Sequence, residues 1–173
     1  GYFLGIWPPG ISGDLGLVEA HTQAAADRFV EAAAILRARV SGAQIITIQN
    51  IIAFERQAWD VPGVFVGVGE RYNHDHLDLV ADSADLIRFN YYYRRAATPF
   101  PADEEIWPAG IRWAIEDLQT RYGKPLVVME NGLGTDSDAF RQAYLRAHIH
   151  RVLPAREEAG EGGGTFIGRW GAT

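Results

Sequence analysis

The spacing of apolar positions along the chain predicts an alternation of helices and strands. From Asp14 to about Val40, apolar and small residues recur every three to four positions, which predicts a long helix capped by Asp14 and ended by Gly42. The β-branched run 44–48 predicts a short buried strand. Residues 86–93, which close on three tyrosines, predict a second strand.

The second half of the chain continues this alternation. A proline in the first turn favours a helix over about 108–122, and the apolar run 126–129 predicts a third strand. A helix over about 137–153 follows, and we expect Pro154 to end or kink it. A glycine-rich turn then leads into residues 165–170, which predict a fourth strand.

Residues 51–81 do not continue the alternation, and we expect a shortened irregular segment there. Within it, the spacing of two histidines resembles a metal-binding patch, which comprises Asn73, His74, Asp75 and His76. Two imidazoles two residues apart can lie on one side of a strand. No third ligand stands at a metal-binding spacing, so we interpret the patch as a solvated polar loop. The sequence predicts neither a metal site nor a cofactor.

The order of elements predicts the α/β class. Strands that alternate with helices form a parallel sheet with helical crossovers, and 173 residues allow a single domain over residues 1–173. Four strands with this spacing fit half of a (β/α)8 barrel or a small open sheet. In both folds the functional side chains lie just beyond the carboxyl ends of the strands.

The ends of the four predicted strands carry side chains suited to binding a sugar. Amides and hydroxyls hydrogen-bond sugar hydroxyls, an indole stacks on the sugar ring, and a carboxylate can attack an anomeric carbon. A Glu-Asn-Gly after a strand is also a common turn, so these residues alone leave catalysis and a plain turn both open. The side chains at the strand ends are Gln49, Asn50, Asn90, Tyr91, Tyr92, Glu130, Asn131 and Trp170.

Composition narrows the classes of partner. The chain has 16 Lys and Arg against 22 Asp and Glu, and its net charge of −6 argues against a nucleic-acid partner. It has no cysteine, which excludes disulfides and thiol catalysis. No apolar run approaches the roughly 20 residues that span a membrane, and no signal-peptide pattern is present. We therefore expect no membrane contact and a cytoplasmic location.

The run Leu126–Gly132 (LVVMENG) closely resembles the nucleophile strand of glycoside hydrolase family 1, the β-glucosidase family. In that family an apolar strand ends in Thr-Glu-Asn-Gly or a close variant. Several other segments resemble family motifs and follow the family's order, which makes the resemblance specific although each motif alone is weak. They are Gly1–Gly10, His21, Asp85–Tyr92, Trp107–Gly110, Arg121–Pro125, Asp138–His148 and Phe166–Trp170.

The resemblance implies a TIM barrel and a retaining glycosidase that hydrolyses the O-glycosyl bond of a β-glycoside or an oligosaccharide. It implies that Glu130 is the nucleophile and that Tyr92 hydrogen-bonds this carboxylate and holds it ionised. Asn90 and Asn131 are expected to support the site and bind substrate, and Trp170 to form the platform beneath the sugar. A retaining mechanism also needs a second carboxyl group about 5–5.5 Å from the nucleophile.

The sequence departs from the family where that second carboxyl group is concerned. The family's acid/base glutamate stands in an Asn-Glu-Pro motif on the strand before the first matching segment, and no Asn-Glu-Pro occurs here. Arg88 replaces a glycine of the family, and Met129, the only methionine, replaces a threonine or serine. We therefore expect the C-terminal half of a barrel, strands five to eight, which lacks the acid/base and is inactive alone.

Two kinds of protein partner are compatible with such a half-barrel. The chain could associate with itself to complete eight strands, or it could join a missing N-terminal half. The alternative to a glycosidase is a truncated pseudoenzyme or a half-barrel sugar-binding or structural protein, which would also need a partner chain.

Overall fold

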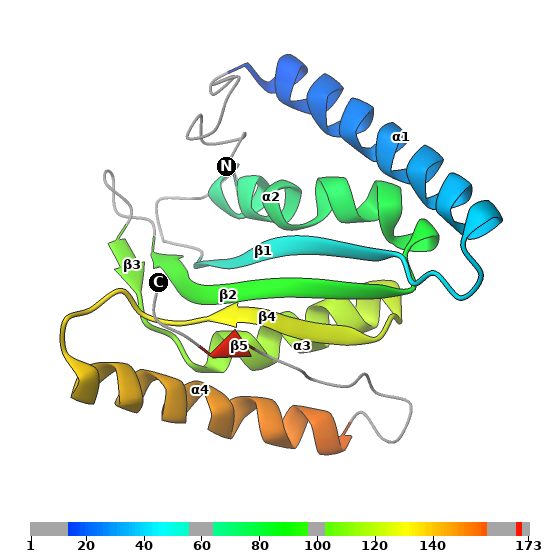
Figure 1. Cartoon of the computed structure of the whole chain (residues 1–173). Helices are drawn as coiled ribbons and strands as arrows, with labels where there is room; N and C mark the ends of the chain where they lie inside the picture. The colour runs from blue at the N-terminus through cyan, green and yellow to red at the C-terminus, as the bar shows by residue number, and fades with distance from the viewer. Residues whose placement is uncertain (1–13, 56–63, 97–102, 159–168, 171–173) are drawn as a thin grey trace.

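The computed structural model describes residues 14–55, 64–96, 103–158 and 169–170. Helices and strands alternate along these residues, and the strands gather into one sheet (Figure 1). The elements are α1 (Leu15–Arg39), β1 (Ile46–Glu55), α2 (Val64–Val80), the 3-10 helix η1 (Ala81–Ser83), β2 (Leu86–Ala96), β3 (Asp103–Glu105), α3 (Ala109–Tyr122), β4 (Leu126–Asn131), α4 (Asp138–Glu158) and β5 (Arg169–Trp170).

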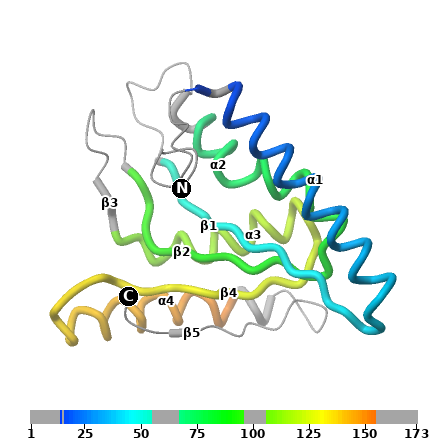
Figure 2. The backbone as a smooth tube through the Cα atoms, turned by 45° about the horizontal axis from the view of Figure 1, so that its top comes forward, coloured from blue at the N-terminus to red at the C-terminus, as the bar shows by residue number. Residues whose placement is uncertain are grey.

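Four of these strands form a parallel sheet in the order β1-β2-β4-β5. The short strand β3 pairs antiparallel with the end of β2. Helix α2 lies beside β1, α3 lies behind β2 and β4, and α1 packs on α2, farther from the sheet (Figure 2). This is the parallel α/β arrangement that the alternation predicts, and it brings the carboxyl ends of the strands to one edge.

The hydrophobic core lies between one face of the sheet and the helices. Alternate residues of β2 point into it, because Ile87, Phe89 and Tyr91 are fully buried while the residues between them are partly exposed. Ile111 and Leu118 of α3 belong to the same buried cluster. The residues of β2 between the buried ones, which include Asn90 and Tyr92, lie on the opposite face of the sheet.

The predicted ends of α1 and α3 are confirmed, and strands β1, β2 and β4 are longer than predicted. The Asp14 carboxylate accepts a hydrogen bond from the backbone of Leu17 (3.0 Å) and caps α1. Gly123 adopts a left-handed conformation (φ 60°) and ends α3. Strand β1 runs through Glu55 and β2 through Ala96, because their parallel pairing continues past the apolar runs that predict them.

The expectation of an irregular segment over 51–81 is wrong. Strand β1 fills its start, and α2 covers most of its second half. Asn73 and His74, expected in a solvated loop, are 3% and 2% exposed. The side chain of Asn73 accepts a hydrogen bond from the backbone N–H of Ile52 (3.0 Å) and donates one to the Ile52 carbonyl (2.8 Å). A neighbouring strand would make the same pair of bonds. The buried amide of Asn73 is satisfied by these two hydrogen bonds inside the protein.

Helix α4 begins as predicted but does not end at Pro154. The Ser137 hydroxyl accepts a hydrogen bond from the backbone of Phe140 (3.3 Å), and the helix continues to Glu158. Proline removes the hydrogen bond of its own N–H, and the helix completes only a final turn beyond it. Strand β5 is the described part of the strand predicted over 165–170, and residues 165–168 lie outside the described residues. The segment 1–10, which resembles a family motif, also lies outside them.

None of the helices described here is both long enough and apolar enough to cross a membrane.

Candidate functional site

A row of polar residues crosses the sheet from the middle of β1 and β2 to the carboxyl end of β4. Asn50 of β1 lies in register with Asn90 of β2, and Asn90 lies in register with Glu130 of β4. The register between β2 and β4 shifts by one residue immediately before this row, so that Met129 is the extra residue on β4. Such bulges re-aim the next side chain and recur beside functional sites.

Tyr92 and Glu130 form the centre of the site. The Tyr92 hydroxyl donates a hydrogen bond to Oε2 of the Glu130 carboxylate, which is exposed at the end of β4. Burial of the half-buried Tyr92 raises the pKa of its phenol, and the hydrogen bond to Glu130 raises it further. Tyr92 therefore stays protonated at neutral pH and remains a hydrogen-bond donor to this carboxylate.

Asn131 follows Glu130 but points into the scaffold. It is 2% exposed, and its amide nitrogen donates to the backbone carbonyl of Tyr91 (2.6 Å) and to the hydroxyl of Tyr144 (3.1 Å). Its contacts therefore tie β4 to β2 and α4, on the face of the sheet away from the row. The expected contact of Asn131 with substrate stays a prediction.

Helix α4 fixes the strand that carries Tyr92. The Tyr144 hydroxyl donates to the backbone carbonyl of Tyr92 (2.6 Å), and the Tyr144 ring stacks on His148 with 3.9 Å between ring centroids. His148 is fully buried, and its Nδ1 lies 2.8 Å from the Tyr144 carbonyl. Burial lowers the pKa of His148, so this imidazole is neutral and donates from Nδ1.

Four of the five predicted site residues lie on β2 and β4: Asn90 and Tyr92 within β2, and Glu130 and Asn131 at the carboxyl end of β4. Glu130, Tyr92 and Asn90 gather on one face, and Asn131 supports them from behind. The buried Oδ1 of Asn90 has no hydrogen-bond partner among the described residues. The backbone of Trp170 lies in register with Asn131, and the placement of its side chain is outside the described residues.

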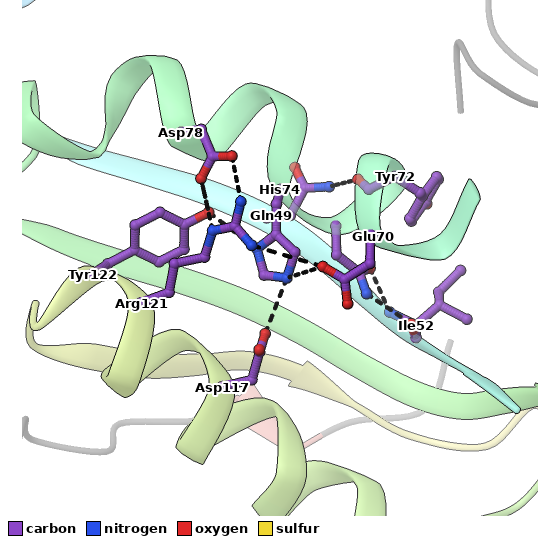
Figure 3. Close-up of polar contacts among 10 residues, drawn as sticks. Gln49, Ile52, Glu70, Tyr72, His74, Asp78, Asp117, Arg121 and Tyr122 are labelled. Carbon is purple, nitrogen blue, oxygen red and sulfur yellow. Dashed lines mark hydrogen bonds and ion pairs between the residues drawn. The ribbon is translucent and has the colours of Figure 1, made fainter. Parts of the chain in front are cut away.

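A second polar cluster joins α2 to α3 on the helical side of the molecule (Figure 3). His74 lies between Asp117 Oδ2 at Nε2 (3.1 Å) and the Tyr122 hydroxyl at Nδ1 (3.0 Å). Tyr122 donates in turn to Asp78 (2.8 Å), and Arg121 donates to both oxygens of Asp78 at 2.9 and 2.6 Å. The sequence reading missed this cluster, because its members are far apart in sequence.

Within this cluster the charge of Arg121 lies beside the carboxylate of Asp78. Burial alone would raise the pKa of Asp78, but the hydrogen bonds from Arg121 and Tyr122 outweigh it and hold that pKa below its usual value. Glu70 of α2 adds a carboxylate 3.7 Å from Arg121 and 3.9 Å from His74. The contacts of this cluster join α2 to α3. Among the described residues no group of three or more His, Asp or Glu could hold a metal ion.

Comparison with known proteins finds relatives for part of the chain. No protein-family model matches the sequence. A 6-phospho-β-glucosidase of Clostridium longisporum is 28% identical over 130 residues, which cover 53% of this chain and 27% of the relative. An aryl-phospho-β-D-glucosidase of Bacillus subtilis is 30% identical over 116 residues, covering 49% of this chain and 24% of the relative. A β-galactosidase of Sulfolobus acidocaldarius is 43% identical over 54 residues.

Solved structures match nearly the whole chain. A β-glucosidase from Thermotoga maritima superposes with a TM-score of 0.75 at 19% identity, over 98% of this chain and 50% of that chain. A second structure, of a family 1 β-glucosidase from the same organism, superposes with a TM-score of 0.74 over 49% of that chain. The chain thus spans about half the length of these enzymes, and the expectation of half a TIM barrel is confirmed. In sequence over the matched segments, and in fold over nearly its whole length, the chain resembles one half of a family 1 β-glucosidase.

Proposed function

We propose that this chain carries the nucleophile of a retaining β-glycosidase site, with Glu130 in that role. The observation that carries the proposal is the hydrogen bond from Tyr92 to Glu130 at the carboxyl end of a parallel strand. Carboxylates at this position of a half-barrel face the mouth of the fold, where catalytic groups of TIM barrels stand. The similarity to enzymes named for β-glucosides supports the same chemistry.

The proposed reaction begins with attack on the anomeric carbon of a β-glycoside. Oε2 of Glu130 is held by Tyr92, and the other carboxylate oxygen forms the bond to the anomeric carbon while the bond to the leaving oxygen breaks. The product is a glycosyl ester of Glu130, and water later cleaves it. Tyr92 fixes the carboxylate in one orientation, which lowers the cost of reaching the attack geometry.

A complete catalytic cycle needs a second carboxyl group. In the family this group stands in an Asn-Glu-Pro motif, which is absent from this sequence. That group protonates the leaving oxygen in the first step and activates water in the second. We propose that the chain alone does not turn over ordinary glycosides, and that a complementary half would bring the acid/base beside Glu130. Truncation to a sugar-binding or structural half-barrel is the competing function, and it predicts no covalent chemistry at Glu130.

The class of glycone is proposed from the relatives and from a cation at the end of β2. The two relatives named for phosphorylated β-glucosides favour a β-glucoside with or without a phosphate group. Arg94 lies with its guanidinium 5.1 Å from the ring centre of Trp107, beyond Tyr92 on the same strand. Both the plain and the phosphorylated sugar therefore belong in any test of binding.

A mechanism-based label tests the nucleophile without requiring the missing acid. A dinitrophenyl 2-deoxy-2-fluoro-β-glucoside and its 6-phosphate both carry a leaving group that departs without protonation, and the fluorine slows release of the glycosyl ester. We expect intact-mass spectrometry to show one added glycosyl group on the full chain, and peptide mapping to place it on Glu130.

Glu130→Gln is the matched control, because it keeps the size of the side chain and its capacity to accept the hydrogen bond from Tyr92. The variant should take up no label. A wild-type chain that remains unlabelled with both sugars while keeping its native circular dichroism spectrum would refute the proposal and favour the structural half-barrel.

A further inference from the structure

Tyr92 stands at an irregular point of β2. In the register between β1 and β2, Ile52 faces both Tyr92 and Tyr93, which makes a bulge on β2. On the other side, the registered pairing of β2 with β4 ends at Asn90 and Glu130. Among the described residues, Tyr92 therefore has a registered partner on neither neighbouring strand. Contacts from outside the regular ladder have to fix the place of its phenol.

Side chains of α4 and β4 bind the backbone of β2 at this point. The Tyr144 hydroxyl donates to the carbonyl of Tyr92 (2.6 Å), and the amide nitrogen of Asn131 donates to the carbonyl of Tyr91 (2.6 Å). The same amide donates to the Tyr144 hydroxyl (3.1 Å), so that these contacts form one network. Both hydrogens of the Asn131 amide and the single hydroxyl hydrogen of Tyr144 are thereby used.

The network is buried and held in one orientation. Tyr144 is 3% exposed, and its ring is stacked on the fully buried His148 with 28° between the ring planes. This packing restricts rotation of the Tyr144 ring, so that its hydroxyl stays at the carbonyl of β2. Opposite the bulge, the side chain of Asn73 binds both the N–H and the carbonyl of Ile52. Side chains therefore hold the backbone on both sides of the bulge.

We infer that Tyr144 and Asn131 are positioning residues for the proposed nucleophile. Asn131 follows Glu130 in the chain, and Tyr91 precedes Tyr92. The hydrogen bond between Asn131 and Tyr91 on one face of the sheet therefore braces the hydrogen bond between Tyr92 and Glu130 on the other. This role does not require Asn131 to contact substrate. The inference rests on the proposed function, because it concerns the attack by Glu130.

Loss of the network should slow the attack without changing how the sugar binds. A misplacement of about 1 Å in a positioned group can cost up to about a hundredfold in rate. Tyr144→Phe keeps the stacked ring and removes only the hydroxyl that holds the carbonyl of Tyr92. The Tyr92 phenol then keeps its own hydrogen bond to Glu130 but is held less firmly, so the effect should be smaller than that of removing the phenol itself.

Labelling of the full chain at a series of label concentrations tests the inference, with the dinitrophenyl 2-deoxy-2-fluoro-β-glucoside and its 6-phosphate as probes. We expect Tyr144→Phe to lower the labelling rate at saturation by about threefold to tenfold and to leave the half-saturating concentration unchanged. In a chain that already carries Tyr92→Phe, the same substitution should have no further effect, because Tyr144 acts through Tyr92.

Tyr122→Phe is the matched control. It also removes a tyrosine hydroxyl from a hydrogen-bonded network, but in the cluster that joins α2 to α3. It should label at the wild-type rate even where it lowers stability. Far-ultraviolet circular dichroism gives the folded fraction to which each rate is referred. Asn131→Ala is a second test variant that keeps the Tyr144 hydroxyl, and it should slow labelling in the same way if Tyr144→Phe does not fold.

The failure of this inference can be told apart from the failure of the proposed function. Wild-type labelling rates in both Tyr144→Phe and Asn131→Ala would overturn the inference and leave Glu130 as the nucleophile. A change in the half-saturating concentration alone, or a further loss of rate when Tyr144→Phe is added to Tyr92→Phe, would also overturn it. A wild-type chain that takes up no label would refute the proposed function, and the inference with it.

Discussion

Glu130 owes its position to the residues immediately around it. The bulge at Met129 brings Glu130 opposite Asn90, and Tyr92, two residues farther along the same strand, reaches its carboxylate. Tyr144 holds the backbone of Tyr92 from the other face of the sheet. The resemblance to the family motif predicts the pairing of Tyr92 with Glu130. The one-residue shift in register between β2 and β4 cannot be predicted from an apolar strand sequence.

Replacing Tyr92 by phenylalanine should slow the covalent labelling of Glu130 by about tenfold to a hundredfold. A hydrogen bond to a charged group contributes roughly 1.5–3 kcal/mol, and its loss frees the carboxylate to rotate away from the attack geometry. The measurement is the rate of mass increase with the fluorinated glucoside. Tyr93→Phe, at the next position of β2, should label at the wild-type rate, and equal rates for both variants would contradict the role of Tyr92.

Tyr144→Phe should lower the free energy of unfolding by about 1–3 kcal/mol. The variant keeps the ring that stacks on His148 but leaves the buried amide of Asn131 with one partner fewer and removes the bond to the carbonyl of Tyr92. Urea denaturation followed by tyrosine and tryptophan fluorescence measures the difference. A variant as stable as the wild type would show that the scaffold behind the site tolerates the loss.

At the scale of elements, α2 is the helix that the sequence pattern does not predict. Periodic stretches such as α1 and α3, and apolar runs such as β4, are predicted well because their burial is one-sided or complete. Helix α2 carries glycines and polar residues that suggest a loop. Its burial depends on partners distant in sequence, such as Asp117 and Tyr122 of α3 around His74, and no local pattern contains that information.

The cluster between α2 and α3 should make stability depend on acid. The folded pKa of Asp78 lies below its unfolded value, so its contribution is present above about pH 4 and is lost as the pH falls through the lower folded pKa. Asp78→Asn should therefore lose stability at neutral pH and show a shallower decline below about pH 4. Urea midpoints across this range measure it, with Asp82→Asn of η1 as control. Parallel curves for wild type and Asp78→Asn would contradict the account.

The start of α3 should not tolerate a methyl group. A Cβ on Gly110 would lie in the space of the Tyr91 ring and 2.6 Å from the Trp107 indole, so Gly110→Ala should cost about 1–3 kcal/mol of stability. Gly67, near the start of α2, has nothing within 4 Å of such an atom. Gly67→Ala should be neutral or stabilise by up to about 1 kcal/mol. The melting temperatures of both variants test this prediction. Equal changes in melting temperature for Gly110→Ala and Gly67→Ala would contradict it.

At the scale of the whole molecule, the described residues form a four-stranded parallel unit that resembles half of a TIM barrel. Glu130 stands at the carboxyl end of one of its strands, β4. In the proposed function, such a half-barrel would supply one catalytic carboxylate and would depend on a partner for the group that faces it across the barrel. Sequence resemblance predicts this division, because the acid/base and the nucleophile stand on strands in different halves.

The most direct test of that division is the release of dinitrophenolate from dinitrophenyl β-glucoside and its 6-phosphate by the chain alone. Because this leaving group needs no acid, the account predicts a burst that approaches one equivalent per chain, then little further release, and no burst from Glu130→Gln. It predicts no release of phenol from phenyl β-glucoside, whose leaving oxygen needs a proton. Absence of any burst, or steady Glu130-dependent turnover of phenyl β-glucoside, would contradict the claim that the chain supplies the nucleophile and lacks the acid.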